Sequence, residues 1–198
     1  VFRNPNVVIN GNDGDTVFPQ ILLTNSHDGK NAFTFTAGLF RLVCENGLVI
    51  STQQFEDVKL RHMGYTFEEL QTKIHEMVER LPLTVESMNK MKQIKLEEKQ
   101  AIKFAKKAIE TRFNEEEIKN IKIDFNELLT PTRPEDKGND LWSVFNVVQE
   151  KLIHGMFEYT VDNESIAAKT RKARKIKNFN QDITINTKLY DLAMEFCN

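Results

Sequence analysis

The chain has 198 residues, of which 40% are hydrophobic and 28% charged, with 27 Lys and Arg against 29 Asp and Glu. The formal net charge of −2 excludes a globally basic nucleic-acid protein, although it permits a local basic patch. Eight glycines and five prolines exclude a collagen-like chain, and no apolar run approaches the ~20 residues of a membrane span. Two cysteines make no disulfide framework, so we expect a soluble, intracellular protein.

Residues 1–65 predict an antiparallel β region. Short apolar runs alternate here with Asn-Gly and Asp-Gly pairs, which favour hairpin turns. Asn46-Gly47 is the strongest turn pattern and predicts a two-residue turn between strands at 39–44 and 48–51. The other strands are expected near 7–9, 18–23, 33–36 and 58–63.

Residues 66–198 predict mainly helices. Thr66 and Glu69 have capping-box spacing, and we expect a helix from there to Pro82, which would end it. Its apolar face would comprise Phe67, Leu70, Ile74, Met77 and Leu81. Further helices are expected at 84–92 and 96–113, and the segment 115–126 is ambiguous.

The remainder predicts a rigid loop at 130–134 and two helices. Asp140 is expected to cap a helix that runs to about residue 153, and Gly155 to end it. Residues 158–168 suggest a loop, and Asn186 a cap for the last helix. The predicted fold class is therefore α+β, with an N-terminal antiparallel sheet of hairpins (1–65) and a mostly helical part (66–198) packed on it as a single domain.

Three polar clusters in the β region form a candidate motif site. Because hairpins in so short a segment fold back on one another, we expect these clusters to converge. The site comprises Asn25, His27, Asp28, Arg41, Cys44, Asn46 and His62. In the plainer alternative the loop side chains cap their own amides and Cys44 is a small buried hydrophobe.

Metal and cofactor patterns are missing from the sequence. His27, Cys44 and His62 lack the C-x-x-C or H-x-x-x-H spacing of structural zinc sites, so we expect no metal. No P-loop, G-x-G-x-x-G, H-E-x-x-H or G-x-S-x-G motif is present, and we expect no cofactor.

The sharpest local charge anomaly lies at residues 169–177, where six of nine residues are cationic and none is acidic. These are Lys169, Arg171, Lys172, Arg174, Lys175 and Lys177. Such a run can neutralise several phosphates, or can be a solvated surface. Phe179 follows directly and could stack on a base. With Arg41, Arg61 and His62, the six cations form the predicted nucleic-acid-binding set.

Several stretches resemble the phage/plasmid-related proteins, a family of bacterial mobile elements with a domain of unknown function. They are the polar motifs at 25–29, 38–48 and 61–62, then 133–136, 140–150 with Gly155, and 180–186. The resemblance implies a role in DNA maintenance, recombination or counter-defence, in the cytoplasm of a bacterial host. Strands followed by a long helix are also the layout of phage single-strand annealing proteins, an analogy of fold alone.

Together these observations favour a non-enzymatic DNA-binding protein, with single strands preferred, acting in single-strand annealing, recombination or replication. One alternative is a hydrolase or nuclease that uses His27, Asp28 and His62, with or without a metal. Another is a counter-defence factor that binds a host protein. We expect no membrane partner, and self-association into a homo-oligomer remains open.

Overall fold

The computed structural model describes residues 2–3, 9–10, 16–24, 33–41, 47–49, 58–60, 66–163 and 166–197. The chain divides into two compact units, Val1–Asn89 and Lys90–Asn198. This boundary falls within a long helix, so the division at residue 65 stays a prediction. Each unit is described separately below.

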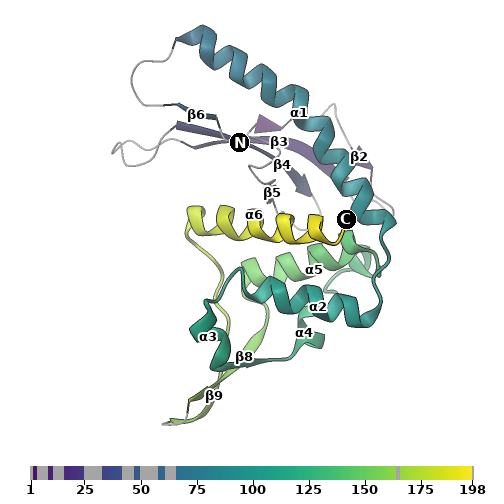
Figure 1. The fold of residues 1–198 in the computed structure, drawn as a ribbon, viewed down its shortest axis with the longest axis vertical. Helices are drawn as coiled ribbons and strands as arrows, with labels where there is room; N and C mark the ends of the chain where they lie inside the picture. Colours follow the sequence, from purple (N-terminus) through teal and green to yellow (C-terminus); the bar gives the residue numbers. More distant parts are fainter. Residues whose placement is uncertain are drawn as a thin grey trace. The chain divides into compact units, whose positions relative to one another are not determined.

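Unit 1 contains an antiparallel sheet built around one long strand pair (Figure 1). Strands β3 (Thr16–Thr24) and β4 (Phe33–Arg41) pair along almost their whole length. The shorter strands are β1 (Phe2–Arg3) and β2 (Ile9–Asn10) on β3, with β5 (Gly47–Val49) and β6 (Val58–Leu60) on β4. Pro19 in β3 lies between the segments that pair with β1 and β2, where a missing N–H disrupts neither short ladder.

The hairpin between β4 and β5 has a different register from the one predicted. Gly47 is not a turn residue, because it pairs with Phe40 inside the ladder. A two-residue turn at 46–47 would have placed Glu45 opposite Leu48, whereas the observed register places Leu39 there. The predicted two-residue turn at 46–47 is therefore wrong.

Helix α1 (Phe67–Gln93) begins at the predicted capping box but does not end at Pro82. The Thr66 amide donates to Glu69 Oε2 at 2.8 Å, and the Glu69 amide donates to Thr66 Oγ1 at 3.2 Å. The single helix replaces the two that were predicted. Phe67 is 76% exposed and does not belong to an apolar core face.

Unit 2 is organised around one buried helix, α5 (Leu141–His154), whose residues are buried from Leu141 to Ile153. Helices α2 (Glu98–Ile109), α4 (Phe125–Leu129) and α6 (Phe179–Glu195) pack against it. Unit 2 also contains the short helices α3 (Glu115–Lys119) and η2 (Pro134–Asp136). Aromatic rings fill the core: Phe104 lies 6.5 Å from Phe145, measured between ring centroids.

The limits of α5 agree with the prediction and those of α6 do not. Asp140 accepts a hydrogen bond from the Ser143 amide at 3.0 Å, and Gly155 ends α5 with φ of 68°. Helix α6 begins at Phe179 and is capped by Asn178, whose side chain accepts a hydrogen bond from the Gln181 amide. Asn186 does not cap the helix but lies buried within it. Its side-chain amide is satisfied there by polar partners on α5 and α6.

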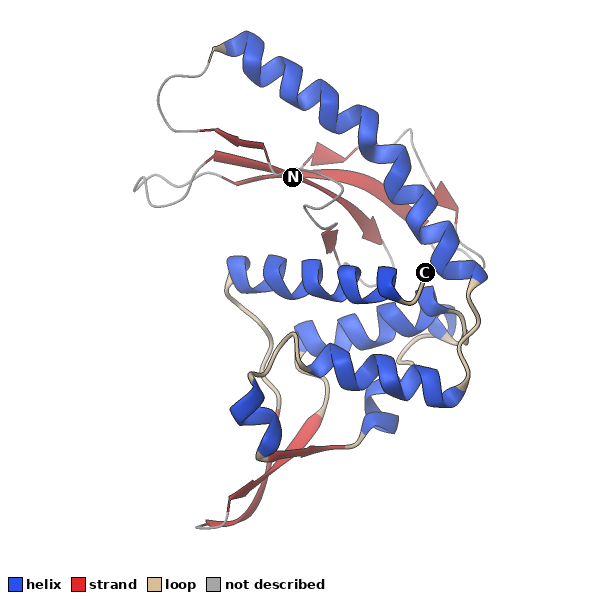
Figure 2. Ribbon diagram, viewed as in Figure 1, coloured by secondary structure: helices blue, strands red, loops and turns tan. Residues whose placement is uncertain are grey.

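Unit 2 also contains a three-stranded antiparallel sheet that the sequence analysis missed. Strand β7 (Ile121–Ile123) pairs with β8 (Glu158–Asn163), which pairs with β9 (Ile166–Lys172). The predicted loop at 158–168 is therefore wrong. Within unit 2 the hairpin of β8 and β9 projects away from the helices (Figure 2).

These elements confirm the α+β fold class. A strand-rich N-terminal part precedes a mainly helical part, which also carries the small second sheet. Among the described helices, none combines the length and apolar character that a membrane crossing requires.

Candidate nucleic-acid interface

The predicted site residues fall into two groups. Arg41 ends strand β4, where its backbone pairs with Val17. The other motif residues lie outside the described part of the chain: Asn25, His27, Asp28, Cys44, Asn46, Arg61 and His62. Their convergence into one site stays a prediction.

The cationic run at 169–177, hereafter the basic segment, is described throughout. Its first four residues end strand β9, and its last five lead towards helix α6. All six cationic residues are exposed. Ala173 is buried and Ile176 half-buried in their midst, so the segment is anchored by its apolar residues and presents its cations to solvent.

Arg112 holds the basic segment through its main chain. The Arg112 guanidinium donates from Nη2 to the Arg174 carbonyl oxygen at 2.5 Å and from Nη1 to the Leu152 carbonyl oxygen. It also lies 5.5 Å from the ring centroid of Phe157. Burial lowers the pKa of this guanidinium below its ordinary value. An arginine stays protonated even so, and its planar fork suits two carbonyl acceptors.

Two backbone hydrogen bonds and a glycine complete this attachment. The Ala173 amide donates to the Phe157 carbonyl at 2.9 Å, and the Ile176 amide donates to the Ile153 carbonyl at 2.8 Å. Gly155 lies against the same stretch, because a Cβ there would be 2.5 Å from the Arg174 carbonyl carbon. The end of α5 thus fixes the path of the basic segment.

A cluster of charged side chains lies around His154, the last residue of α5, near Lys175 of the basic segment. Burial lowers the pKa of His154 below its ordinary 6.5, and the nearby Lys175 lowers it further, while Glu150 and Asp182 oppose both effects. Burial raises the pKa of Asp182 above its ordinary 3.8, although His154 acts in the opposite direction. The basic segment therefore borders a half-buried His and Asp, whose charges depend on pH.

Phe179 adds an exposed aromatic ring at the end of the basic segment. It is the first residue of α6 and is 48% exposed. An exposed ring beside cations is the pairing that single-stranded nucleic-acid sites use, since bases stack on the ring while cations contact phosphates.

A second polar cluster ties the helices together and was not predicted from the sequence. Glu150 is 3% exposed and accepts from Arg133 Nη2 and from Thr132 Oγ1, the latter at 2.7 Å. Gln149 donates to Asn186 Oδ1 at 2.5 Å, which links α5 to α6. A buried charge such as that of Glu150 needs a partner, and Arg133 supplies it. Two of the stretches that carry the family resemblance, 133–136 and 180–186, therefore have structural contacts in this cluster.

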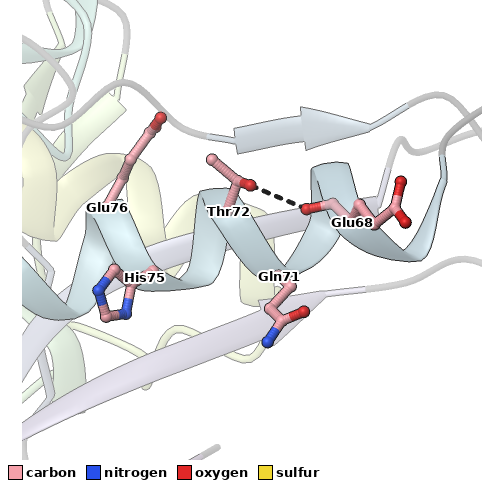
Figure 3. A pocket seen from close by; sticks show the side chains of 5 residues that line it. All are labelled: Glu68, Gln71, Thr72, His75 and Glu76. Atoms are coloured by element: carbon pink, nitrogen blue, oxygen red, sulfur yellow. Dashed lines mark hydrogen bonds between the residues drawn. The ribbon is translucent and has the colours of Figure 1, made fainter.

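Unit 1 has a shallow pocket along α1 that does not suit an anion. Figure 3 shows the side chains that line it, with Thr72 Oγ1 donating to the Glu68 carbonyl at 2.9 Å. The lining residues are Glu68, Gln71, Thr72, His75 and Glu76. The two carboxylates among these described lining residues would repel phosphate.

The described residues contain histidine, cysteine and carboxylate side chains that could in principle bind a metal ion. No group of three or more His, Cys, Asp or Glu side chains among them is arranged to hold a metal ion. His27, Asp28 and His62, the residues of the predicted hydrolase alternative, lie outside this part of the chain.

These features define an α+β chain whose second unit has a buried helical core and an exposed basic segment. Residues 3–189 match the family described as Domain of unknown function (DUF932), and the chain belongs to that family. No solved structure matches the chain.

Two curated proteins of Escherichia coli (strain K12) are similar to this chain. "UPF0380 protein YafZ" is 29% identical and "UPF0380 protein YfjQ" 28% identical, each over 175 residues. Both alignments cover 88% of this chain and 61% of the relative. The chain thus spans about three-fifths of the length of these relatives.

Proposed function

We propose that this chain binds nucleic acid without catalysing a reaction on it, with single-stranded DNA as the preferred ligand. The observation that carries the proposal is the basic segment, in which six exposed cations occupy nine residues of a stretch that is anchored through its main chain. Phosphate neutralisation by such a run releases counterions and supplies affinity independent of base sequence. The proposed setting is a bacterial mobile element, in single-strand annealing, recombination or replication.

The anchoring supports binding rather than mere solubility. Cations on a fixed backbone lose less conformational freedom on binding than cations on a free tail. Arg112 holds the carbonyl at Arg174, in the middle of the cationic run. Phe179, two residues after the basic segment, has an exposed ring on which a base can stack.

The test reverses the charge of four cations in the basic segment, Arg171→Glu, Lys172→Glu, Arg174→Glu and Lys175→Glu. Binding to a fluorescent single-stranded oligonucleotide is measured over a series of salt concentrations. We expect weaker binding and a log–log salt slope that is shallower by up to about 3, since each lost phosphate contact removes about 0.7. Circular dichroism should show an unchanged fold, because exposed substitutions usually cost less than about 0.5 kcal/mol.

A matched control reverses four other exposed lysines of unit 2. These are Lys99, Lys103, Lys137 and Lys188. This variant changes the net charge by the same amount, so it should retain most of the affinity if the basic segment is the interface. Equal losses in both variants, or no binding by the wild-type chain at low salt, would contradict the proposal.

A further inference from the structure

The sheet of β7, β8 and β9 carries cations on both of its faces. Residues directly opposite each other in an antiparallel ladder share a face, and successive residues alternate between faces. Tyr159 is opposite Arg171 and Val161 is opposite Lys169, so both cations lie on one face, the tyrosine face. Ile121 and Ile123 of β7 belong to the same face.

The opposite face, the threonine face, has its own cations. Thr160 is opposite Thr170, and their hydroxyl oxygens are 3.2 Å apart, which confirms the shared face. Lys122 of β7 is opposite Thr160, and Lys172 is two residues beyond Thr170. Glu158, opposite Lys172, is an acidic residue on the same face.

Each face can contact a phosphodiester backbone. All four lysine and arginine side chains are exposed, as is Thr170. Serine and threonine hydroxyls contact phosphate oxygens alongside Arg and Lys, and thus Thr170 adds to the threonine face. At the base of the sheet, Tyr159 is half-buried and packs against Phe113, with ring centroids 5.4 Å apart, so the exposed part of the tyrosine face is its β9 edge.

We propose that this sheet holds two nucleic-acid strands at once, one backbone on each face. The inference rests on the proposed function and deepens it. Two polyanionic strands repel each other when they approach, and cations placed between them offset that repulsion. A single bound strand would use the cations of one face only, whereas cations on both faces allow a second strand to bind to the same sheet.

The test is a capture assay with two single-stranded oligonucleotides that are not complementary. One is immobilised, the other carries a fluorophore, and captured fluorescence reports bridging. The wild-type chain should capture the second strand. Two face variants remove the cations of one face each: Lys169→Gln with Arg171→Gln, and Lys122→Gln with Lys172→Gln. Each should still bind one strand, because one face and the rest of the basic segment remain. The captured fluorescence should fall more than about tenfold in each.

The control variant Lys99→Gln with Lys103→Gln removes two exposed cations of α2 and should capture like the wild type. Capture that persists in both face variants would mean that two copies of the chain bridge the strands, which overturns the inference. Wild-type binding of one strand without capture of the second overturns the inference but leaves the proposed function. Failure of the wild type to bind either strand overturns both.

Discussion

Gly155 shows how one residue fixes the course of the basic segment. Its φ of 68° lies in the left-handed region, which costs a residue with a Cβ roughly 1 kcal/mol. The main chain at Ala173 and Arg174 also fills the space where a Cβ would lie. The end of α5 and the course of the basic segment therefore both require a residue without a Cβ at position 155.

We expect Gly155→Ala to lower the free energy of unfolding by about 2 kcal/mol or more, because backbone strain and the close contact both oppose the methyl group. Urea denaturation followed by circular dichroism measures this change. The neighbouring variant Met156→Ala, at a residue 39% exposed, serves as control and should change stability little. A stable Gly155→Ala variant would show that Ala173 and Arg174 do not lie against this turn.

His154 makes stability depend on pH near neutrality. Its pKa in the folded chain is below 6.5, so as the pH falls through this range the unfolded chain takes up a proton that the folded chain does not. The free energy of unfolding should therefore fall as the pH drops from about 7.5 to about 6. Asp182 acts at lower pH and with the opposite sign, because its raised pKa favours protonation of the folded chain.

The measurement compares wild type and His154→Gln by urea denaturation across that pH range. The variant should lose less stability on acidification, because its side chain does not titrate. The difference between the two curves isolates the contribution of the side chain at position 154. Parallel curves for the two proteins would contradict the lowered pKa of His154.

Among the elements, α1 is the one in which tertiary structure most clearly outweighs local preference. Pro82 lacks the N–H that would bond to the Val78 carbonyl, a loss that costs a helix interior about 3 kcal/mol. The helix continues nevertheless, with Pro82 exposed and with Met88 and Met91 buried near its C-terminal end. Burial of those two side chains offsets the proline penalty.

Replacing this proline should stabilise the chain. We expect Pro82→Ala to raise the free energy of unfolding by about 1 to 3 kcal/mol, since alanine restores a hydrogen bond and has a higher helix propensity. Thermal unfolding by circular dichroism checks the change. Leu83→Ala, at the adjacent exposed position, provides the comparison, and a decrease in stability for Pro82→Ala would mean that the proline is needed for the shape of α1.

The success of sequence-based prediction differed between elements for physical reasons. Both ends of α5 were predicted because Asp140 and Gly155 act within one turn of the chain. Strands β8 and β9 were missed because the cations of β9 obscured its period-two pattern, although Tyr159 and Val161 alternate with Thr160. The false cap at Asn186 arose because an isolated Asn can cap a helix or pair across a core, and only packing distinguishes the two.

The same limit applies to the candidate site. The basic segment was found from its charge, which needs no structure. Its anchoring by Arg112 could not be predicted, because the contact joins residues 62 positions apart. The two-sided arrangement of its cations follows from the register of β7, β8 and β9, which a sequence without recognised strands does not supply.

At the scale of the whole molecule, a nearly neutral chain has one short run of six cations in nine residues with no acidic residue among them. The formal net charge is −2, so attraction to nucleic acid depends on the local field of the basic segment rather than on overall charge. That field is screened within about 8 Å at physiological ionic strength, which makes direct contacts decisive.

The salt dependence of binding therefore has an upper limit. The basic segment and Lys122 supply seven cations, so the log–log salt slope on single-stranded DNA should be no steeper than about −5, at about 0.7 per contact. Titrations between about 50 and 200 mM salt measure this slope. A steeper slope would indicate phosphate contacts beyond these seven cations, and variants of Arg41 and Arg61 would test whether unit 1 supplies them.

The position of β9 at the edge of its sheet has a consequence for the behaviour of the chain in solution. An outer strand presents unpaired backbone groups on which the strand of another molecule can add. Lys169, Arg171 and Lys172 place like charges along that edge, so two copies that approach edge to edge repel each other. The cations that attract phosphate thus also protect the hairpin from aggregation, and light scattering of the charge-removal variants should show self-association where the wild-type chain shows none.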